Sequence, residues 1–351
     1  MKKKQHSVFD KVVFIGPDLK GNGGIASVLA LYSYSFDIFH YLPTNSHKGK
    51  VAGYFNFLSS LLSLPFLRIK GRKIVHIHYA GRGSWKRKSI VLQLAKALGY
   101  KTIMHCHCDL CLLSRNNGYD NVKRVLKQAD VNIALASSFK QFAEKELKLT
   151  NIKIVNNPIE VSSYNPRVRS DNSITTFLFL GLLIKEKGCY DIIEAAKILK
   201  QRNKEFQITL GGTGYEENVL KELSHKNGLD SYISFTGWIK GDKKRALLEK
   251  SHVIILPSYN EAMPMTILEA KSLGKPVIST KVGAVPDILA DGENGFLIAV
   301  GDVKALAENM EKYIDNPSLL NEHSEASYKS VSSFDINHIK NRLEVIYKSL
   351  L

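Results

Sequence analysis

The sequence predicts an α/β protein made of two Rossmann-like, doubly wound parallel-sheet domains. Short β-rich runs alternate with helix-length segments from end to end, as in βαβ units around a parallel sheet. The alternation restarts after the polar stretch at 161–173, and 351 residues suit about two domains. We therefore predict a first domain at 1–165, a second at 166–334, and a final helix at 335–351 that can pack on either domain, including back on the first.

Apolar runs of strand length and segments with helical spacing predict the elements of the first domain. Fully apolar runs indicate strands that are buried on both faces of a sheet. The predicted strands are 11–16, 73–79, 101–107, 131–136 and 152–157, and the predicted helices are 25–33, 89–99 and 139–149. The uncharged run 51–67 contains Pro65 and several polar residues, so it predicts a buried or interfacial helix rather than a membrane span.

The same two patterns recur in the second domain. Its predicted strands are 175–181, 206–212, 233–237, 253–258 and 276–280, and its predicted helices are 190–201, 217–228, 243–251, 265–274 and one near 303–313. Doubly wound sheets bind ligands where strands end and helices begin. Two such domains predict a ligand site in a cleft between them.

The net charge of +16 is distributed unevenly along the chain. Residues 1–165 hold 25 basic and 9 acidic residues, whereas the remainder holds 24 of each. A surplus of this size points to nucleic acid, an anionic membrane surface or a phosphorylated substrate. The sequence has no interleaved basic and aromatic residues and no nucleic-acid-binding module, so we expect no nucleic acid partner.

The segment 256–297 carries the most chemical information. A strand ends before Glu261, and a helix begins near Pro264, a residue favoured in a first helical turn. The amides of Met265 and Thr266 in that turn have no acceptor within the helix, which makes them a natural phosphate site.

Two carboxylates flank this helix start. Glu261 precedes the helix and can face a group beyond the phosphates, while Glu269 lies about one turn further along and can accept hydrogen bonds from a ribose. Carboxylates that meet sugar hydroxyls are what a nucleotide-sugar site requires.

Glu261 and Glu269, with GKPVIST, VGAVPDIL and DGENGFL after them, resemble the donor-site signature of the family 4 (group 1) retaining glycosyltransferases, which have the GT-B fold. Further motifs agree in order over nearly the whole chain. Gly23 and Gly24 in GNGGIASV resemble the first glycine-rich loop of the family. Lys187, with the glycine after it, matches the phosphate loop of the second domain. The family places two further segments around the nucleotide of the donor. They are matched here by LGGTGYEE, which contains Gly212, and by FTGW, which contains Gly237.

The resemblance implies transfer of a sugar from a nucleotide sugar, with UDP the expected nucleotide, and retention of the donor's α-linkage. Lys187, the amides of Met265 and Thr266 and the Gly23–Gly24 loop would stabilise the departing diphosphate, so neither a metal nor a cofactor is expected. Glu261 and His107 would orient the sugar, with Glu261 not assigned as a covalent nucleophile.

The chain departs from the family pattern at two positions. Leu182 stands where the family usually has an arginine, and we hypothesise that Lys185 compensates for it. Ala262 stands where the family mostly has glycine, which narrows the allowed backbone geometry.

Histidines and cysteines gather in TIMHCHCDLC, so a zinc site has to be weighed. No second CxxC or HxxxH pair completes a structural zinc site, and alternation along the strands sends the histidines and the cysteines to opposite faces. His107 best matches the family histidine, and His105 is its nearest competitor. A core role explains His76, His78 and His105 better. Four cysteines form no disulfide framework, which favours a reducing cytosol.

The basic first domain is expected to face the acceptor. Ser84, Arg87 and Lys88 follow a predicted strand and could hold an acceptor phosphate, or could form an ordinary solvated helix start. We expect a lipid-linked or similar glycan acceptor of polysaccharide biosynthesis, and a cytoplasmic protein peripheral on the inner face of the cell membrane.

Other functional classes remain open. A nucleotide-sugar epimerase of GT-B shape, or a non-catalytic nucleotide-sugar-binding assembly protein, would carry the same donor motifs. A nicotinamide-dependent oxidoreductase does not fit, because GNGGIA is not GxGxxG followed by an acidic residue about 20 positions later.

Overall fold

The computed structural model describes residues 7–21, 23–161 and 174–351. The chain divides into two compact units. The first comprises residues 1–160 together with 334–351, and the second comprises 161–333. Most of the expected linker, 162–173, lies outside the described residues.

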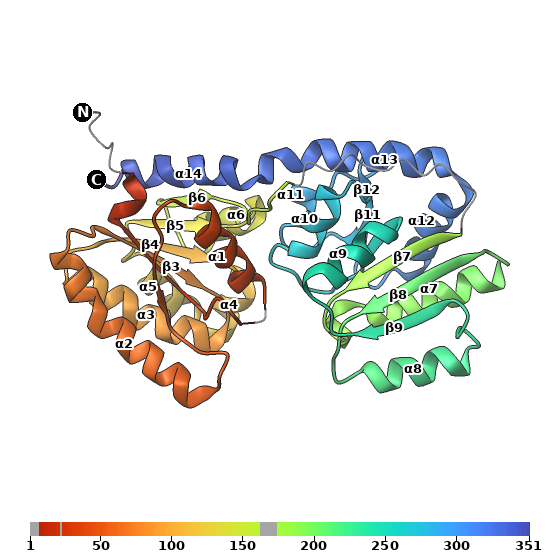
Figure 1. The fold of residues 1–351 in the computed structure, drawn as a ribbon, viewed down its shortest axis with the longest axis horizontal. Coiled ribbons are helices and arrows are strands. Elements are labelled where there is room, and N and C mark those ends of the chain that lie inside the picture. Colours follow the sequence, from red (N-terminus) through yellow and green to blue (C-terminus); the bar gives the residue numbers. More distant parts are fainter. Residues whose placement is uncertain (1–6, 22, 162–173) are drawn as a thin grey trace. The chain divides into compact units, whose positions relative to one another are not determined.

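The first unit contains a six-stranded parallel sheet in the order β2-β1-β3-β4-β5-β6 (Figure 1). Its strands are β1 (Val12–Gly16), β2 (His40–Pro43), β3 (Ile74–Tyr79), β4 (Lys101–Cys106), β5 (Val131–Ala134) and β6 (Ile152–Ile154). The central strands β1 and β3 are buried along their whole length because helices cover both faces of the sheet.

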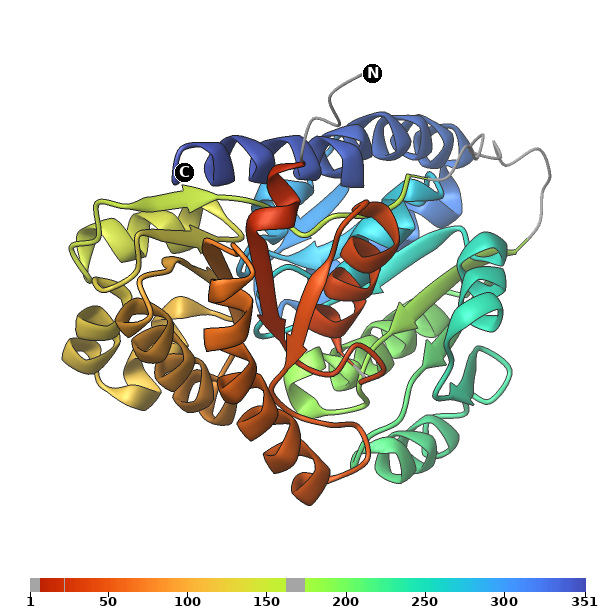
Figure 2. The same ribbon diagram turned by 60° about the vertical axis from the view of Figure 1, so that its left-hand side comes forward.

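The helices of the first unit include the last helix of the chain. They are the 3₁₀ helix η1 (Val8–Lys11) and the α-helices α1 (Gly24–Ser35), α2 (Lys50–Ile69), α3 (Arg82–Ala97), α4 (Leu110–Asn117), α5 (Tyr119–Leu126), α6 (Ser137–Lys145) and α14 (Ile336–Lys348). Figures 1 and 2 show α14 alongside η1, and the Arg342 guanidinium donates to the carbonyl of Ile154 at 2.6 Å. The C-terminal helix thus packs on the first unit.

The second unit contains another six-stranded parallel sheet, in the order β12-β11-β10-β7-β8-β9. Its strands are β7 (Thr175–Leu180), β8 (Phe206–Gly211), β9 (Ile233–Gly237), β10 (Val253–Leu256), β11 (Val277–Thr280) and β12 (Gly295–Ile298). Its helices are η2 (Lys185–Lys187), α7 (Cys189–Gln201), α8 (Glu217–Lys226), α9 (Gly241–Lys250), α10 (Met265–Ser272), α11 (Val285–Ile288), α12 (Val303–Asp315), α13 (Pro317–Ser330) and η3 (Val331–Phe334). Phe334, the last residue of η3, already belongs to the first unit.

These strand orders create one switch point in each sheet. In the second unit the chain runs outward through β7, β8 and β9 and then returns to the other side of β7 with β10. The connections after β7 and β10 therefore lead to opposite sides of the sheet, and folds of this kind bind ligands at the carboxyl ends of the strands at such a point. In the first unit the corresponding point lies between β1 and β3.

The predicted fold class is confirmed, and the structure adds elements that the sequence reading omitted. These are β2, β12 and the helices α4, α5, α11 and α13. Helix α3 begins at Arg82, seven residues before the predicted start at 89, so Ser84, Arg87 and Lys88 lie within its first two turns. None of the helices among the described residues, α2 included, is long and apolar enough to cross a membrane.

Candidate functional site

Close contacts of backbone with backbone shape the switch point of the second unit. Gly188 follows η2 with a φ of +70°, and a Cβ atom there would lie 2.1 Å from the carbonyl oxygen of Pro257 after β10. At Gly212 a Cβ atom would lie 1.7 Å from the carbonyl oxygen of Gly181 after β7. Only glycine lets the three loops approach each other this closely.

An ion pair spans this switch point. Lys187 follows β7 and Glu261 follows β10, and the Lys187 ammonium lies 2.5 Å from Oε1 of Glu261. The buried Ser258 hydroxyl donates to the same oxygen at 2.9 Å. The Glu261 side chain is only 11% exposed, so its carboxylate is held in one position between two donors.

The start of α10 lies beside this pair in sequence and leaves two amides available. Pro264 is the N-cap, with an extended backbone, and Met265 is the first helical residue. No hydrogen bond of the Met265 or Thr266 amide is recorded among the described residues. The Thr266 hydroxyl donates to the carbonyl of Leu180 at 3.4 Å, which ties the helix start to the end of β7. Free amides at a helix N-terminus attract anions.

Glu269, further along α10, already has a cationic partner. Its Oε2 atom lies 2.5 Å from the ammonium of Lys244 on α9. Sequence reasoning missed Lys244, because α9 also carries Lys243, Arg245 and Lys250 and nothing in their spacing distinguishes one of them. A ribose that binds Glu269 would share its carboxylate with Lys244.

Gly283, to which the sequence analysis gave no role, positions the Glu261 loop. It has a φ of +54°, and a Cβ atom there would lie 2.0 Å from the carbonyl oxygen of Glu261. The next amide, of Ala284, donates to the carbonyl of Ala262 at 2.7 Å. The VGAVPDIL segment therefore supports the carboxylate loop directly.

The other predicted positions of the second unit lie around these loops. Leu182 is 46% exposed, and the ammonium of the exposed Lys185 lies 5.9 Å from the ring centroid of Tyr190. Gly237 ends β9 with a φ of +69°, and no atom approaches its Cβ position within 4 Å. The structure brings Lys187 to Glu261. Within the described residues, the Lys185 side chain forms no hydrogen bond or ion pair with either of them.

The glycine-rich loop of the first unit joins β1 to α1. Gly23 is the N-cap of α1 with a φ of +126°, and Gly24 is the first helical residue. Nothing lies within 4 Å of a Cβ atom built on Gly23, so its backbone is open on that side. Asn22 lies outside the described residues.

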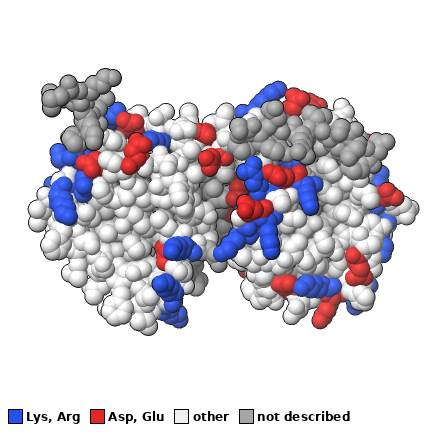
Figure 3. Space-filling view, in the orientation of Figure 1, with Lys and Arg blue, Asp and Glu red and all other residues white. Residues whose placement is uncertain are grey.

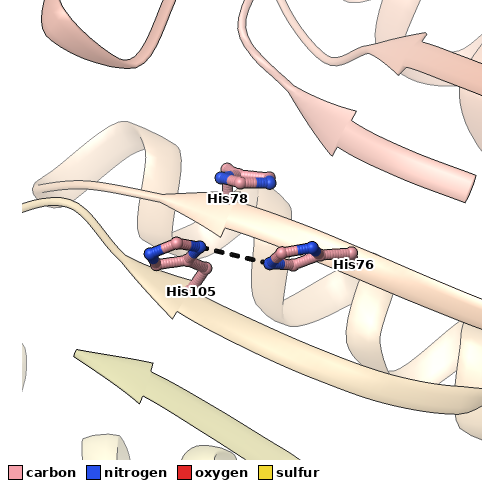
Figure 4. A group of neighbouring side chains, drawn as sticks. All are labelled: His76, His78 and His105. Carbon is pink, nitrogen blue, oxygen red and sulfur yellow. Dashed lines mark hydrogen bonds between the residues drawn. The ribbon is translucent and has the colours of Figure 1, made fainter. Parts of the chain in front are cut away.

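Four histidines from β3 and the end of β4 form a buried group, here called the histidine ladder (Figure 4 labels three of them). Its members are His76, His78, His105 and His107. The Nδ1 atom of His76 lies 2.7 Å from the Tyr347 hydroxyl on α14, and its Nε2 atom lies 3.2 Å from Nδ1 of His105. The Nδ1 atom of His78 lies 2.8 Å from Nε2 of His107.

Burial keeps the histidine ladder uncharged. It lowers the pKa of His76 and of His107 to about 3, and it lowers the pKa values of His78 and His105 well below the ordinary value. A hydrogen bond with the Asn157 side chain opposes this shift in the pKa of His107. His107 is therefore a neutral imidazole at physiological pH, suited to hydrogen bonding rather than to charge stabilisation.

Nitrogen atoms of His76, His78 and His105 all lie within 4.8 Å of one another, which is close enough for a shared metal ion. Both nitrogens of His76 are already engaged, one by Tyr347 and one by His105. An ion at this position would require His76 to give up its bond to His105. The hydrogen bonds favour a core role for these three histidines, and the expectation that the protein needs no metal stays a prediction.

The ladder predicts that acid destabilises the first unit. Unfolded histidine takes up a proton below about pH 6.5, whereas folded His76 and His107 resist protonation down to about pH 3. The unfolded state therefore binds more protons below about pH 6.5, so the stability of the unit falls as the pH falls through that value. Between about pH 7.5 and pH 5 each of these two histidines is expected to remove about 2 kcal/mol of unfolding free energy.

Trp85 is 2% exposed in the first unit and reports this loss by its fluorescence during denaturant unfolding, in a Trp238→Phe background. The His76→Gln variant should show a smaller decrease in stability between the two pH values. The exposed His225, changed to glutamine, is the matched control and should behave as the parent does. Equal pH dependence in all three proteins would contradict this account of the ladder.

The three expected acceptor-side residues differ in their environments. The Ser84 hydroxyl accepts from the amide of Ala80 at 3.3 Å and closes the turn before α3. Arg87 is half-buried, and its Nε atom has no hydrogen-bond partner in the part of the chain that is described. Lys88 is only 1% exposed and its ammonium donates to the hydroxyl of Thr44. Lys88 is thus buried rather than part of a solvated helix start, and its role toward the acceptor stays a prediction.

Two Rossmann-like units, each with a six-stranded parallel sheet, form the architecture called the GT-B fold. Residues 165–330, within the second unit, match the family described as "Glycosyl transferases group 1". The second unit thus matches the group 1 glycosyltransferase family over nearly its whole length.

Several curated proteins are similar to this chain. The chain is 25% identical over 312 residues to an uncharacterised 41.2 kDa protein in the cps region of Klebsiella pneumoniae, with 83% of this chain and 84% of that protein covered. Four further curated relatives match over only 43–49% of their own lengths.

Solved structures show the same fold. HepE from Anabaena, in complex with UDP, superposes with a TM-score of 0.73 at 16% identity, covering 97% of this chain and 100% of that one. The lipopolysaccharide outer core galactosyltransferase WaaB superposes with a TM-score of 0.69 at 19% identity, covering 97% and 99%.

Proposed function

We propose that this glycosyltransferase moves a sugar from a UDP-sugar to an acceptor hydroxyl, with retention at the anomeric carbon and without a metal ion. The observation that carries the proposal is the Lys187–Glu261 pair at the switch point of the second sheet, near the free amides that begin α10. HepE, which shares the fold, has been solved with UDP and with UDP-glucose, and this supports a uridine nucleotide.

In this proposal, binding of the donor breaks the ion pair between Lys187 and Glu261. A diphosphate competes with Glu261 for the Lys187 ammonium and also accepts from the amides of Met265 and Thr266. These donors stabilise the negative charge that develops on the departing nucleotide. The Gly23–Gly24 loop is the proposed first-unit contact of the same diphosphate.

Once Lys187 turns to the diphosphate, the Glu261 carboxylate becomes free to accept hydrogen bonds from the sugar. Ser258 still holds one of its oxygens in place, so the carboxylate is positioned before the sugar arrives. His107 contributes a neutral imidazole that orients the sugar. The acceptor hydroxyl attacks from the face that the nucleotide leaves, which retains the α-linkage. Glu269 is the proposed partner of the ribose, and the loops with Gly212 and Gly237 lie near the nucleotide.

For the acceptor we propose a lipid-linked or similar glycan in polysaccharide biosynthesis, used on the inner face of the cell membrane. The excess basic charge in residues 1–165 supports an anionic surface as partner. The printed names of two similar proteins, which mention a cps region and a lipopolysaccharide outer core, support the polysaccharide setting. Ser84, Arg87 and Lys88 are the proposed contacts of an acceptor phosphate.

The experiment that tests transfer against epimerisation uses UDP-sugars with and without a membrane-lipid extract. Transfer predicts a labelled glycolipid that forms only when the extract is present, with release of UDP. An epimer of the sugar nucleotide, formed from the donor alone, would refute transfer in favour of the epimerase alternative. Donor binding with neither product would favour the non-catalytic alternative.

The charge of the first unit predicts salt-sensitive binding to anionic vesicles. Vesicles with phosphatidylglycerol should bind the protein at low salt and bind it more weakly at about 0.5 M salt, where the Debye length falls to a few Å. Cosedimentation measures the bound fraction. Equal binding to neutral and anionic vesicles at low salt would contradict the prediction.

A further inference from the structure

The exposed side of α2 is almost entirely apolar. Seven large apolar side chains of this helix are exposed, with fractions from 42% at Leu58 to 83% at Ile69. They are Val51, Tyr54, Phe55, Leu58, Leu62, Phe66 and Ile69. The other exposed residues of α2 are Lys50 and Ser59 alone. A surface helix normally presents polar side chains to water, so this pattern is inverted.

The seven side chains form one continuous stripe. At about 100° per residue their positions span an arc of roughly 120° along the whole helix. The opposite side of the helix is fixed to the first unit. The Ser60 hydroxyl donates to the carbonyl of Pro43 at 2.6 Å, and the carbonyl of the buried Leu64 accepts from the Tyr100 hydroxyl at 2.6 Å. The stripe therefore points away from the core of its own unit.

The sequence that flanks the stripe on both sides is basic. Between Asp37 and Asp109 the sequence contains 12 Lys and Arg residues and no Asp or Glu. Five of these lysines are exposed and have no ion pair among the described residues. They are Lys48, Lys50, Lys70, Lys73 and Lys86. Lys50 and Lys70 directly precede and follow the stripe. Figure 3 shows the lower left of the molecule, where Figure 1 places α2, as mostly uncharged with a few basic groups.

We propose that α2 lies in the plane of an anionic bilayer surface, with the stripe inserted among the acyl chains and the flanking lysines at the lipid phosphates. Apolar insertion beside basic residues is the chemistry of interfacial helices. A second copy of the chain fits less well, because a two-fold interface would bring the same unpaired lysines of both copies together. This inference rests on the membrane-facing part of the proposed function and specifies the element that makes the contact.

The test uses the full chain and vesicles of equal parts phosphatidylglycerol and phosphatidylcholine, without nucleotide sugar or acceptor. The triple variant Phe55→Ser, Leu62→Ser, Phe66→Ser should lower the partition coefficient by about tenfold or more, and the binding that remains should vanish at high salt. The matched control, Val219→Ser, Val300→Ser, Val345→Ser, removes three exposed apolar side chains elsewhere and should bind as the parent does. Unchanged binding by the first triple variant would overturn the inference.

A second measurement keeps the inference testable if the triple variant folds poorly. Leu62→Trp, in a Trp238→Phe background, should give fluorescence that lipids brominated near the headgroup quench when the protein binds. Absence of quenching in bound protein would overturn the proposal. Light scattering that shows a dimer, made monomeric by the triple variant, would identify a second copy as the occupant instead. Sugar transfer to a detergent-solubilised acceptor is assayed separately, so failure of membrane insertion and failure of transferase activity are distinguishable.

Discussion

Replacing Lys187 and Glu261 one at a time is expected to separate donor binding from transfer. Lys187→Ala removes the ammonium proposed for the diphosphate, so the Kd for the UDP-sugar should rise about 10- to 100-fold. Glu261→Ala frees Lys187 from its 2.5 Å ion pair, so donor affinity should be kept or improved. The same change removes the carboxylate that orients the sugar, and kcat should fall about 10²- to 10³-fold. Calorimetry gives the Kd, and a labelled-sugar assay gives kcat.

The control for this pair is Lys185→Ala. Lys185 lies on the same short helix, and its ammonium is near the Tyr190 ring rather than in the ion pair. If Lys185 compensates for Leu182, its alanine variant should also bind the donor less tightly. Unchanged affinity in Lys185→Ala with weakened affinity in Lys187→Ala would reject that compensation. Unchanged donor affinity in Lys187→Ala would contradict the proposed diphosphate site.

Gly283→Ala is expected to be strongly destabilising. Its Cβ atom would lie 2.0 Å from the Glu261 carbonyl oxygen at a φ of +54°, so the Glu261 loop has to move. We expect a loss of roughly 3 kcal/mol or more in the unfolding free energy of the second unit. Transfer should fall as well, because the carboxylate loses its position. Denaturant unfolding followed by Trp238 fluorescence, in a Trp85→Phe background, measures the stability.

Gly292→Ala is the matched control for the contact. Gly292 has a φ of +76°, and no atom lies within 4 Å of its Cβ position. Its alanine variant therefore carries the backbone strain without the collision and should lose only about 1 kcal/mol. Similar losses in the two variants would show that the Gly283 contact contributes little.

Much of the fold could be predicted because local patterns and global topology agree. The runs that became β1 and β10 are apolar on both faces, and only a strand covered on two sides explains this. Strand β2, with four half-buried residues at the sheet edge, and the four-residue β12 lack that signal. Helices α4 and α5 are eight residues each, too short for a clear helical period.

The parts of the site that escaped prediction depend on register and on the length of helices. Pairing of His76 with His105, and of His78 with His107, requires the parallel register of β3 and β4, which a sequence does not display. The burial of Lys88 depends on how α3 packs on the first unit, where the Lys88 ammonium meets Thr44, a residue 44 positions away in sequence. Lys187 and Glu261 could be placed at strand ends, but their contact required knowing that β10 returns beside β7.

The donor panel is the most direct test of the central claim, that the chain transfers a sugar from a nucleotide sugar through Glu261 and His107. Labelled UDP- and GDP-sugars are each incubated with a membrane-lipid extract and the native protein, Glu261→Ala or His107→Ala. The account predicts a labelled glycolipid with at least one UDP-sugar and the native protein, and loss of that product in both variants while their circular dichroism stays native. Transfer that survives both substitutions would contradict the proposed site.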